Sequence, residues 1–293
     1  MNNGNKIISF TVSESCDNMN ANTYLKHHCK ISARMITRLK REYMGITRNG
    51  TLLRTTDTVK AGDRVELKLP VDNSEIIPVK GELEILFEDS YLVAVNKPPF
   101  MPVHPTKVHQ LDTMSNILMY HALQNNEHYT ARILNRLDRD TSGVVVVAKD
   151  RFTAAALQKS IKKTYTAVCE GVIENSFTID APIKIMEGHT IQRCVSLDGE
   201  RAVTHIKPIK NDGCHTLLDI TLETGRTHQI RCHLSYKGYP LAGDDMYGGK
   251  LSYINRQALH CKTVELIHPI TKEKILIDTK LPSDISNILN YFE

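Results

Sequence analysis

The stretch from Leu134 to Asp150 constrains the fold more than any other part of the chain. It opens with a dense group of charged residues, passes through a Thr-Ser-Gly turn and ends in an apolar, β-branched run. Consecutive valines such as Val144–Val147 are typical of a strand that is buried on both faces of a sheet. A charged loop that leads into such a strand stands on rigid scaffold, and loops of this kind often carry catalytic side chains. The stretch therefore predicts a sheet-based fold with a functional loop at the end of a central strand.

Asp138 lies in the charged part of this stretch, and we interpret it as a reactive carboxylate. The alternative is a surface carboxylate that caps a turn or pairs with Arg136. The segment that follows is too apolar to lie on a surface, which argues against this alternative. A second segment that combines turn-forming and basic residues, Thr224–Arg231, follows far downstream. Spacing alone leaves open whether the two segments meet in space.

The composition is that of an ordinary globular protein. The chain has 293 residues, of which 41% are hydrophobic and 24% charged, and this length accommodates one large domain and one small one. Apolar runs are too short for a transmembrane helix or a signal peptide, so we expect a cytoplasmic protein without a membrane partner. The seven cysteines form no CxxC pair, which favours reduced thiols. The histidines form no HExxH motif or Cys–His cluster, so we expect no metal.

Excess positive charge is confined to the first quarter of the chain. Residues 1–79 contain 12 Lys and Arg against 8 Asp and Glu, whereas the rest of the chain contains 25 of each sign. Ser32 is a favourable N-cap for a helix that continues to about Tyr43. Three arginines fall on one face of this helix: Arg34, Arg38 and Arg41. The face is either solvated or part of a surface that meets a polyanion.

The remainder of the N-terminal region is predicted to consist of short strands joined by turns. Alternating apolar residues indicate strands at residues 7–12 and 65–69. Asn49-Gly50 is typical of a hairpin turn, and Gly62-Asp63 indicates another turn. Polar residues and prolines then interrupt the pattern up to Gly81. These boundaries predict three segments: a small basic domain at 1–72, a linker at 73–81 and a larger domain at 82–293.

Strand and helix patterns alternate through the larger region. Apolar alternation or β-branched runs predict strands at residues 83–87, 92–95, 144–147, 163–171, 201–204 and 217–222. Helical periodicity and capping residues predict helices at residues 113–124, 150–161 and 284–292. The proline-rich segment Asn96–Pro105 fits neither a helix nor a central strand.

Several of these motifs resemble one known family. Asn135–Gly143, which reads NRLDRDTSG, resembles the HRLDxxTSG signature of the RluA/RluD family of pseudouridine synthases, with Asn where the family usually has His. Residues 163–171 resemble the KxYxAxVxG motif, and residues 224–248 resemble TGRTHQIRxHxxxxGxPxxGDxxYG. Residues 88–105 resemble EDxxLLVVNKPxGxxVHP, with Phe100 in place of Gly. Because Phe adopts positive φ less readily than Gly, we expect the backbone to differ there.

The N-terminal pattern resembles the ribosomal-protein-S-four-type RNA-binding module. The matching residues are Ser32, Ile36, Leu39, Asn49-Gly50 and Gly62-Asp63-Val65. This resemblance favours a phosphate-tracking surface for the three arginines.

The family resemblance implies an α+β fold, with a mixed, mainly antiparallel bent sheet and flanking helices, beside a small α+β RNA-binding domain. It implies that Asp138 is the catalytic carboxylate and that Arg231 pairs with it within about 4 Å. It also implies that Tyr165 packs on the target base, with Ile230 beneath the base.

Two further residues are expected to bind the substrate. By the same resemblance, Arg136 contacts RNA or helps to open its helix. Lys97 either approaches the RNA backbone or remains a solvated lysine.

We therefore predict an RNA pseudouridine synthase that isomerises uridine in structured RNA without a cofactor. Asp138 either attacks the anomeric carbon or acts as a base on the neighbouring ribose carbon, and the sequence does not choose between these routes. Family members with such an N-terminal module commonly modify large-subunit ribosomal RNA, which we expect here, with tRNA as the alternative. We expect a monomer that binds RNA.

Two other classes of protein fit the sequence less well than an isomerase. A non-catalytic RNA-binding protein accounts for the N-terminal region but leaves the charged motifs of the larger region without a purpose. A glycoside hydrolase needs a second acid, and the adjacent Asp140 is sterically unsuited to that role.

Overall fold

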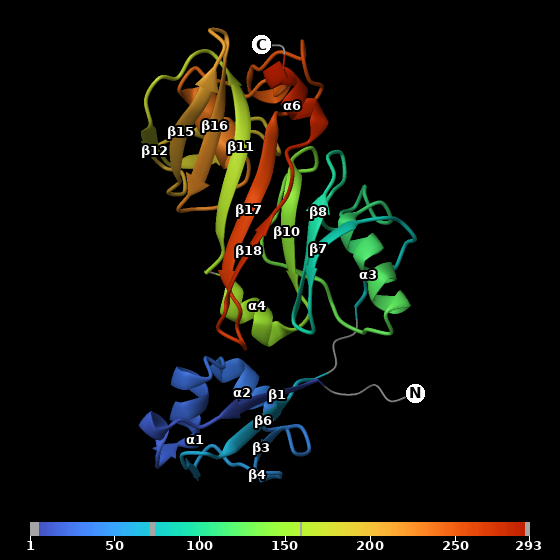
Figure 1. Ribbon diagram of the computed structural model, residues 1–293, viewed down its shortest axis with the longest axis vertical. Helices are drawn as coiled ribbons and strands as arrows, with labels where there is room; N and C mark the ends of the chain where they lie inside the picture. Colours follow the sequence, from blue (N-terminus) through green and yellow to red (C-terminus); the bar gives the residue numbers. More distant parts are fainter. Residues whose placement is uncertain (1–5, 71–73, 159, 291–293) are drawn as a thin grey trace.

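The computed structural model describes residues 6–70, 74–158 and 160–290. The chain forms a small N-terminal unit below a larger unit, and the two are stacked along the long axis (Figure 1). No helix within the described residues is long and apolar enough to cross a membrane. The predicted start of the linker, residue 73, and the predicted end of the last helix, Phe292, lie outside the described residues.

Four strands in the described part of the N-terminal unit form an antiparallel sheet in the order β1-β6-β3-β4. Asn49 and Gly50 turn the β3–β4 hairpin with φ of 49° and 80°, as a tight turn of the I′ type requires. The predicted hairpin is therefore confirmed. The strands of this unit are β1 (Ile7–Thr11), β2 (Met19–Asn20), β3 (Ile46–Arg48), β4 (Thr51–Leu52), β5 (Thr58–Val59) and β6 (Arg64–Lys68).

Helix α2 (Ala33–Leu39) begins where the sequence predicts, because the Ser32 hydroxyl accepts a hydrogen bond from the backbone N–H of Met35. It ends one turn earlier than the predicted Tyr43. The chain folds back so closely that a Cβ at Gly45 would lie 2.0 Å from the carbonyl oxygen of Leu39. Arg41 consequently lies beyond the helix, and the prediction of one helical face for Arg34, Arg38 and Arg41 is wrong. A short helical segment, α1 (Ala21–Thr23) with the following turn Tyr24–His28, packs beside it.

Within the described residues, ten strands of the larger unit form one mixed sheet. Its main path runs β12-β15-β16-β11-β17-β10-β8-β7, with β18 paired to β17 and β9 paired to β10. All of these pairs are antiparallel except β10 with β17. The strands are β7 (Glu84–Glu88), β8 (Leu92–Lys97), β9 (Arg132–Ile133), β10 (Ser142–Ala148), β11 (Lys162–Glu170), β12 (Phe177–Asp180), β15 (Val203–Asn211), β16 (His215–Leu222), β17 (Leu259–Ile267) and β18 (Lys274–Asp278).

Strand β10 is the central strand that the valine run predicts. Every residue of it is buried, between β8 on one side and β17 on the other. Gly143 allows the close approach to β17, because it has φ of 116° and a Cβ there would lie 2.2 Å from the carbonyl oxygen of Cys261. The charged loop before β10 is therefore fixed at the point where the parallel pair begins.

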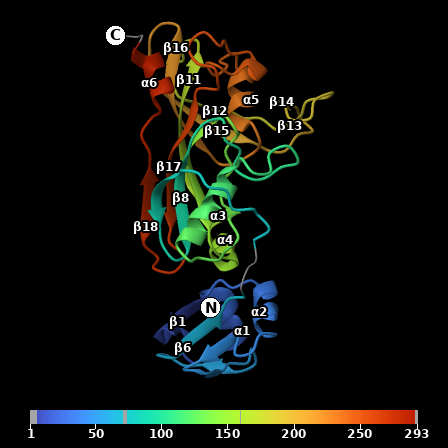
Figure 2. The same ribbon diagram turned by 90° about the vertical axis from the view of Figure 1, so that its right-hand side faces the viewer.

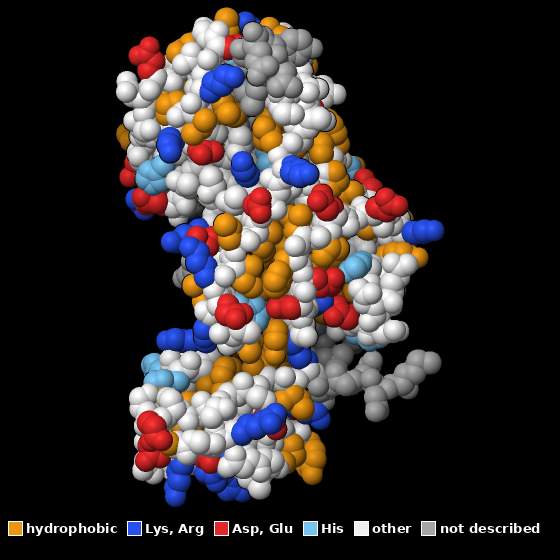
Figure 3. All heavy atoms as spheres, viewed as in Figure 1, with side chains coloured by type: hydrophobic (Ala, Val, Ile, Leu, Met, Phe, Trp, Pro, Cys, Tyr) orange, Lys and Arg blue, Asp and Glu red, His pale blue; other side chains and the backbone are white. Residues whose placement is uncertain are grey.

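In Figure 2, three helices lie on one side of the larger unit, opposite β18, the strand that pairs with β17 off the main path of the sheet. These three are α3 (Met114–Gln124), α4 (Arg151–Leu157) and α5 (Gln229–Tyr236), and α6 (Ser283–Asn290) lies near the C-terminus. Figure 3 shows a band of apolar side chains on the sheet face that these three helices leave uncovered, with charges of both signs around it. Helix α4 ends at Leu157 rather than at the predicted Ile161, since β11 already begins at Lys162.

The two units meet through a small mixed contact. Phe10 and Phe152 pack edge to face, with ring centroids 6.1 Å apart. The Lys6 ammonium pairs with Asp150 and lies 4.0 Å above the ring of Tyr91. These contacts tie the N-terminal strand to the start of α4.

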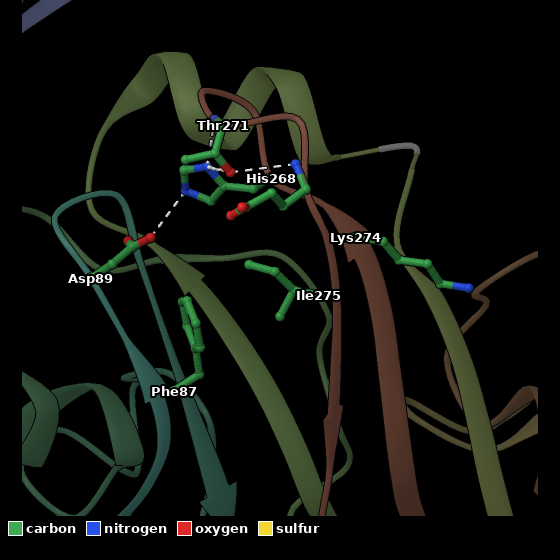
Figure 4. A pocket seen from close by; sticks show the side chains of 7 residues that line it. Phe87, Asp89, His268, Thr271, Lys274 and Ile275 are labelled. Atoms are coloured by element: carbon green, nitrogen blue, oxygen red, sulfur yellow. Dashed lines mark hydrogen bonds and ion pairs between the residues drawn. The ribbon is translucent and has the colours of Figure 1, made fainter.

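A shallow pocket lies beside this contact, between β7 and the β17–β18 hairpin (Figure 4). His268 Nε2 is 3.0 Å from Asp89 Oδ2, and the His268 ring packs edge to face against Tyr91. Phe87 and Ile275 give the lining an apolar part, and Thr271, Glu273 and Lys274 add polar side chains. Asp138 is not among the residues that line this pocket.

Candidate active site

Asp138 and Arg231 meet although 93 positions separate them in the chain. Asp138 lies in the loop between β9 and β10, and Arg231 projects from the first turn of α5. The guanidinium Nη1 is 3.1 Å from Asp138 Oδ2, within the expected ion-pair distance. The Asp138 side chain is 26% exposed and that of Arg231 only 7%. A reachable carboxylate is thus held by a buried cation.

A second carboxylate, Asp244, holds Arg231 in place. Arg231 Nε and Nη2 donate to the two oxygens of Asp244 at 2.7 and 2.8 Å, a bidentate pair. Burial alone would lower the pKa of Arg231, but Asp244 and Asp138 outweigh it and raise that pKa above its ordinary value. Sequence reasoning does not single out Asp244. Asp244 could have been identified from the Gly-Asp pair of the downstream motif, 13 residues after Arg231.

Lys97 is neither an RNA contact nor a solvated lysine, so both predictions for it are wrong. The side chain is fully buried. Its ammonium donates to the carbonyl oxygens of Pro98, Met101 and Arg139 at 2.7, 2.9 and 2.8 Å. Burial lowers the pKa of Lys97 to about 7, whereas three carbonyl acceptors favour the ammonium, the only form with three N–H groups. Lys97 therefore ties the proline-rich loop to the residue after Asp138.

The loop after Asp138 is also held from the C-terminal part of the chain. The buried Arg256 donates through Nη1 to the carbonyl oxygen of Asp140 at 3.1 Å, and its other nitrogens pair with Asp284 of α6. Gln257 Nε2 donates to the Thr141 hydroxyl at 3.1 Å. Hydrogen bonds on successive residues of one loop fix its backbone, which is how a reactive group is held in a single orientation.

Asn135 stabilises the same loop from its other end. Its amide Nδ2 donates to the carbonyl of Val144 and its Oδ1 accepts from the N–H of Val146, both at 2.8 Å. Asn135 is buried, so these two bonds satisfy its polar atoms. Asn135, which stands where the family usually has His, therefore bonds the loop to β10.

Tyr165 lies on β11, within electrostatic reach of Asp138, and Ile230 lies on the helix that carries Arg231. Tyr165 is on β11, paired with Cys261 of β17, and Ile230 precedes Arg231 on α5. Both are buried, at 6% and 4% exposure. Burial raises the pKa of Tyr165 well above its usual value, and the neighbouring Cys261 and Asp138 act in the same direction. Tyr165 is thus a neutral phenol within electrostatic reach of Asp138.

The other predicted substrate-binding residues do not join this cluster. Arg136 is exposed in the loop before Asp138. Arg34 and Arg41 are exposed and Arg38 is half-buried, all on the N-terminal unit. Their roles remain predictions.

Phe100 adopts the conformation that its replacement of Gly is expected to prevent. Its φ is 63°, so the prediction of a changed backbone is wrong. The loop keeps this shape because the Lys97 ammonium bonds the carbonyls of Pro98 and Met101 on either side. Phe100 is 52% exposed, so its side chain contributes little packing to offset the strain.

His228 and Tyr247 also lie at the site, and sequence reasoning does not single them out. His228 is the N-cap of α5, with φ of 56°. Its Nε2 is 3.7 Å from Asp138 Oδ2, and its Nδ1 is 3.0 Å from the Tyr247 hydroxyl. Tyr247 also packs under the guanidinium of Arg231, 5.0 Å from its ring centroid. Both residues belong to the same downstream motif as Arg231, which is the signal that could have identified them.

Comparisons with known proteins define the class of enzyme to which this fold and site belong. Residues 91–236 match the family model of RNA pseudouridylate synthases. The human protein RNA pseudouridylate synthase domain containing 4 superposes with a TM-score of 0.57 at 25% identity, covering 71% of this chain and 92% of that one. The chain is an RNA pseudouridine synthase, with the predicted α+β fold and mainly antiparallel sheet.

Sequence relatives define the branch. The uncharacterized RNA pseudouridine synthase YhcT of Bacillus subtilis is 43% identical over 239 residues, covering 78% of this chain and 79% of that protein. Ribosomal large subunit pseudouridine synthase D of Pseudomonas aeruginosa is 36% identical over 266 residues, covering 84% and 83%. The chain therefore belongs to the RluA/RluD family of pseudouridine synthases, as its motifs predict.

Proposed function

We propose that this enzyme isomerises uridine to pseudouridine in large-subunit ribosomal RNA and that Asp138 is its reactive carboxylate. The observation that carries the proposal is the contact of Asp138 with the buried Arg231 at 3.1 Å. The guanidinium balances the negative charge of Asp138 from a buried position, and its bidentate bond to Asp244 fixes it there.

The reaction requires one bond to break and another to form at the same carbon. The bond between uracil nitrogen 1 and the anomeric carbon breaks, the base turns, and uracil carbon 5 bonds to the anomeric carbon. Carbon 5 then loses its proton, and nitrogen 1 gains one. Asp138 serves this sequence either by attacking the anomeric carbon or by removing a proton from the neighbouring ribose carbon. Either route needs an ionised carboxylate, which Arg231 stabilises.

The neighbouring side chains suit the handling of the free base. In this proposal Tyr165 packs on the uracil and Ile230 lies beneath it, because Tyr165 is within electrostatic reach of Asp138 and Ile230 directly precedes Arg231 on α5. The target uridine must leave its stack, which costs roughly a few kcal/mol. Arg136 is exposed beside Asp138 and would contact the opened RNA.

The substrate assignment rests on the N-terminal unit and on named relatives. We assign residues 1–72 to an RNA-binding domain, 73–81 to a linker and 82–293 to the catalytic domain, since the N-terminal unit and the larger unit each have their own sheets. Arg34, Arg38 and Arg41 supply positive charge on the N-terminal unit. The Pseudomonas aeruginosa relative carries the large ribosomal subunit in its name. We place the enzyme in the cytoplasm, acting as a monomer.

Mapping of pseudouridines tests the substrate. RNA from a strain that lacks the gene should be missing pseudouridine at one or more positions of large-subunit ribosomal RNA, and a plasmid copy should restore them. A plasmid copy that carries Asp138→Asn should not. Loss of pseudouridine from tRNA alone would mean that tRNA, and not ribosomal RNA, is the substrate.

A further inference from the structure

His228 lies beside the reactive carboxylate. Its Nε2 is 3.7 Å from the same oxygen, Asp138 Oδ2, that Arg231 binds. The His228 side chain is only 10% exposed. A distance of 3.7 Å is too long for a hydrogen bond, whose usual limit is about 3.2 Å. Catalytic hydrogen bonds are often long in the free enzyme and shorten when substrate binds.

The hydrogen bonds of Tyr247 favour one tautomer of His228. The Tyr247 hydroxyl oxygen accepts from the backbone N–H of Arg193 at 2.8 Å and lies 3.0 Å from His228 Nδ1. The oxygen is thus already an acceptor, and donation to Nδ1 gives the single phenol proton an acceptor when Nδ1 is unprotonated. A neutral imidazole with Nδ1 unprotonated carries its proton on Nε2. The N–H of His228 therefore points toward Asp138.

The surroundings keep this imidazole neutral and fixed. Burial lowers the pKa of His228, and Arg231 and Arg193 act in the same direction, while Asp138 and Asp244 oppose them. The Tyr247 ring packs edge to face against the imidazole, with centroids 5.7 Å apart. The left-handed backbone at His228 is costly for a residue other than Gly and is found mainly where the surroundings enforce it.

We propose that His228 is a positioning residue for Asp138 and that Tyr247 fixes its tautomer. When substrate binds, the Nε2–H of His228 closes by roughly half an ångström or more to donate to Oδ2. Together with Arg231 it then holds Oδ2, so that Oδ1 is the oxygen presented to the ribose. The opposite tautomer would turn a lone pair of Nε2 toward the carboxylate and repel it. This role rests on the proposed function of Asp138.

His228 is thereby excluded as the base that takes the proton from uracil carbon 5. Its Nε2 already carries a proton, and its Nδ1 accepts from Tyr247. The same geometry gives Tyr247 a part in positioning Asp138, through His228, in addition to its packing.

Variants of both residues test the proposal in single-turnover assays at saturating RNA. His228→Leu removes the donor and should slow isomerisation about 10- to 100-fold, the range found when a residue that orients a metal ligand is removed. His228→Gln places an amide nitrogen near the Nε2 position and should restore part of the rate. RNA affinity should be unchanged in both, so the loss should fall on the rate and not on Kd. His205→Leu removes a partly exposed histidine that pairs with Glu223, away from Asp138, and serves as the control.

Tyr247→Phe removes only the hydroxyl that sets the tautomer. It should slow the reaction less than His228→Leu, and the double variant should be no slower than His228→Leu alone, because the two residues act as one unit. Long-range proton–nitrogen NMR of protein labelled at the imidazole nitrogens should find the His228 proton on Nε2 in the wild type. It should find a mixture of tautomers in Tyr247→Phe.

Three results would overturn this role: a His228→Leu rate equal to that of the wild type, fully additive effects of the two substitutions, or a wild-type proton on Nδ1. Asp138→Asn, assayed in parallel, separates the two proposals. An inactive Asp138→Asn with an unimpaired His228→Leu rejects the positioning role alone, whereas an active Asp138→Asn rejects the proposed function itself.

Discussion

Replacing Arg231 with Met should damage stability and activity for separable reasons. The guanidinium forms ion pairs with Asp244, whose side chain is 1% exposed, and with Asp138, whose side chain is 26% exposed. Removing one partner of a buried pair costs about 3–5 kcal/mol, because the surviving charge is left unpaired. Nearly all of that loss should come from Asp244, since a partly exposed pair contributes only about 0–1 kcal/mol. Asp138→Asn should therefore leave the free energy of unfolding within about 1 kcal/mol of the wild type.

A double variant separates the two effects. Arg231→Met combined with Asp244→Leu replaces the buried pair by apolar side chains, a change that is often neutral or stabilising. Urea denaturation should then show unfolding free energy recovered to near the wild-type value, while isomerisation remains abolished. Arg231→Lys should rescue activity in part, because Lys keeps the charge without the bidentate fork. Full activity in the double variant, or wild-type stability in Arg231→Met alone, would refute the assignment of Arg231.

Three further predictions concern other parts of the molecule. Replacing Arg34, Arg38 and Arg41 with Gln should weaken RNA binding and reduce its salt dependence by roughly one log–log unit or less for each phosphate that is no longer neutralised; an unchanged slope in filter-binding titrations would mean that these side chains are only solvated. Phe100→Gly should raise the free energy of unfolding by about 1 kcal/mol in urea titrations, since Gly adopts the observed φ of 63° without strain; a decrease would mean that Phe100 packs more than its exposure indicates. Burial lowers the pKa of the fully buried His260 to about 4, so the unfolded state takes up the proton first as pH falls. Unfolding free energy should drop by up to about 3 kcal/mol between pH 6.5 and 4, and His260→Gln should remove that part of the pH dependence.

Local sequence patterns predict much of this fold, because apolar runs reflect which residues are buried and cap and turn residues reflect the local backbone geometry. The valine run of β10 is buried at every position, as a strand between two neighbours must be. Ser32 and Asn49-Gly50 specify their cap and turn through backbone geometry that few residues adopt. The contact of Asp138 with Arg231 could be expected only through the family motifs, because it joins elements far apart in the chain.

Contacts outside each predicted element decide what those patterns leave open. Lys97 is predicted to be exposed because lysine usually is, yet carbonyls from two separate loops enclose its ammonium. The end of α2 depends on the close return of Gly45, which helical periodicity does not report. Phe100 keeps a left-handed backbone because the bonds of Lys97 on either side enforce it. In each case the deciding partner comes from tertiary structure or from a turn beyond the predicted element.

Release of tritium from RNA labelled at uracil carbon 5 tests the role of Asp138 most directly, because isomerisation frees that hydrogen and binding alone does not. The wild-type enzyme should release tritium from ribosomal RNA and form a matching amount of pseudouridine. Asp138→Asn, with unchanged stability and RNA affinity, should release none. Tritium release by Asp138→Asn at more than a few per cent of the wild-type rate would contradict the assignment of Asp138 as the reactive carboxylate.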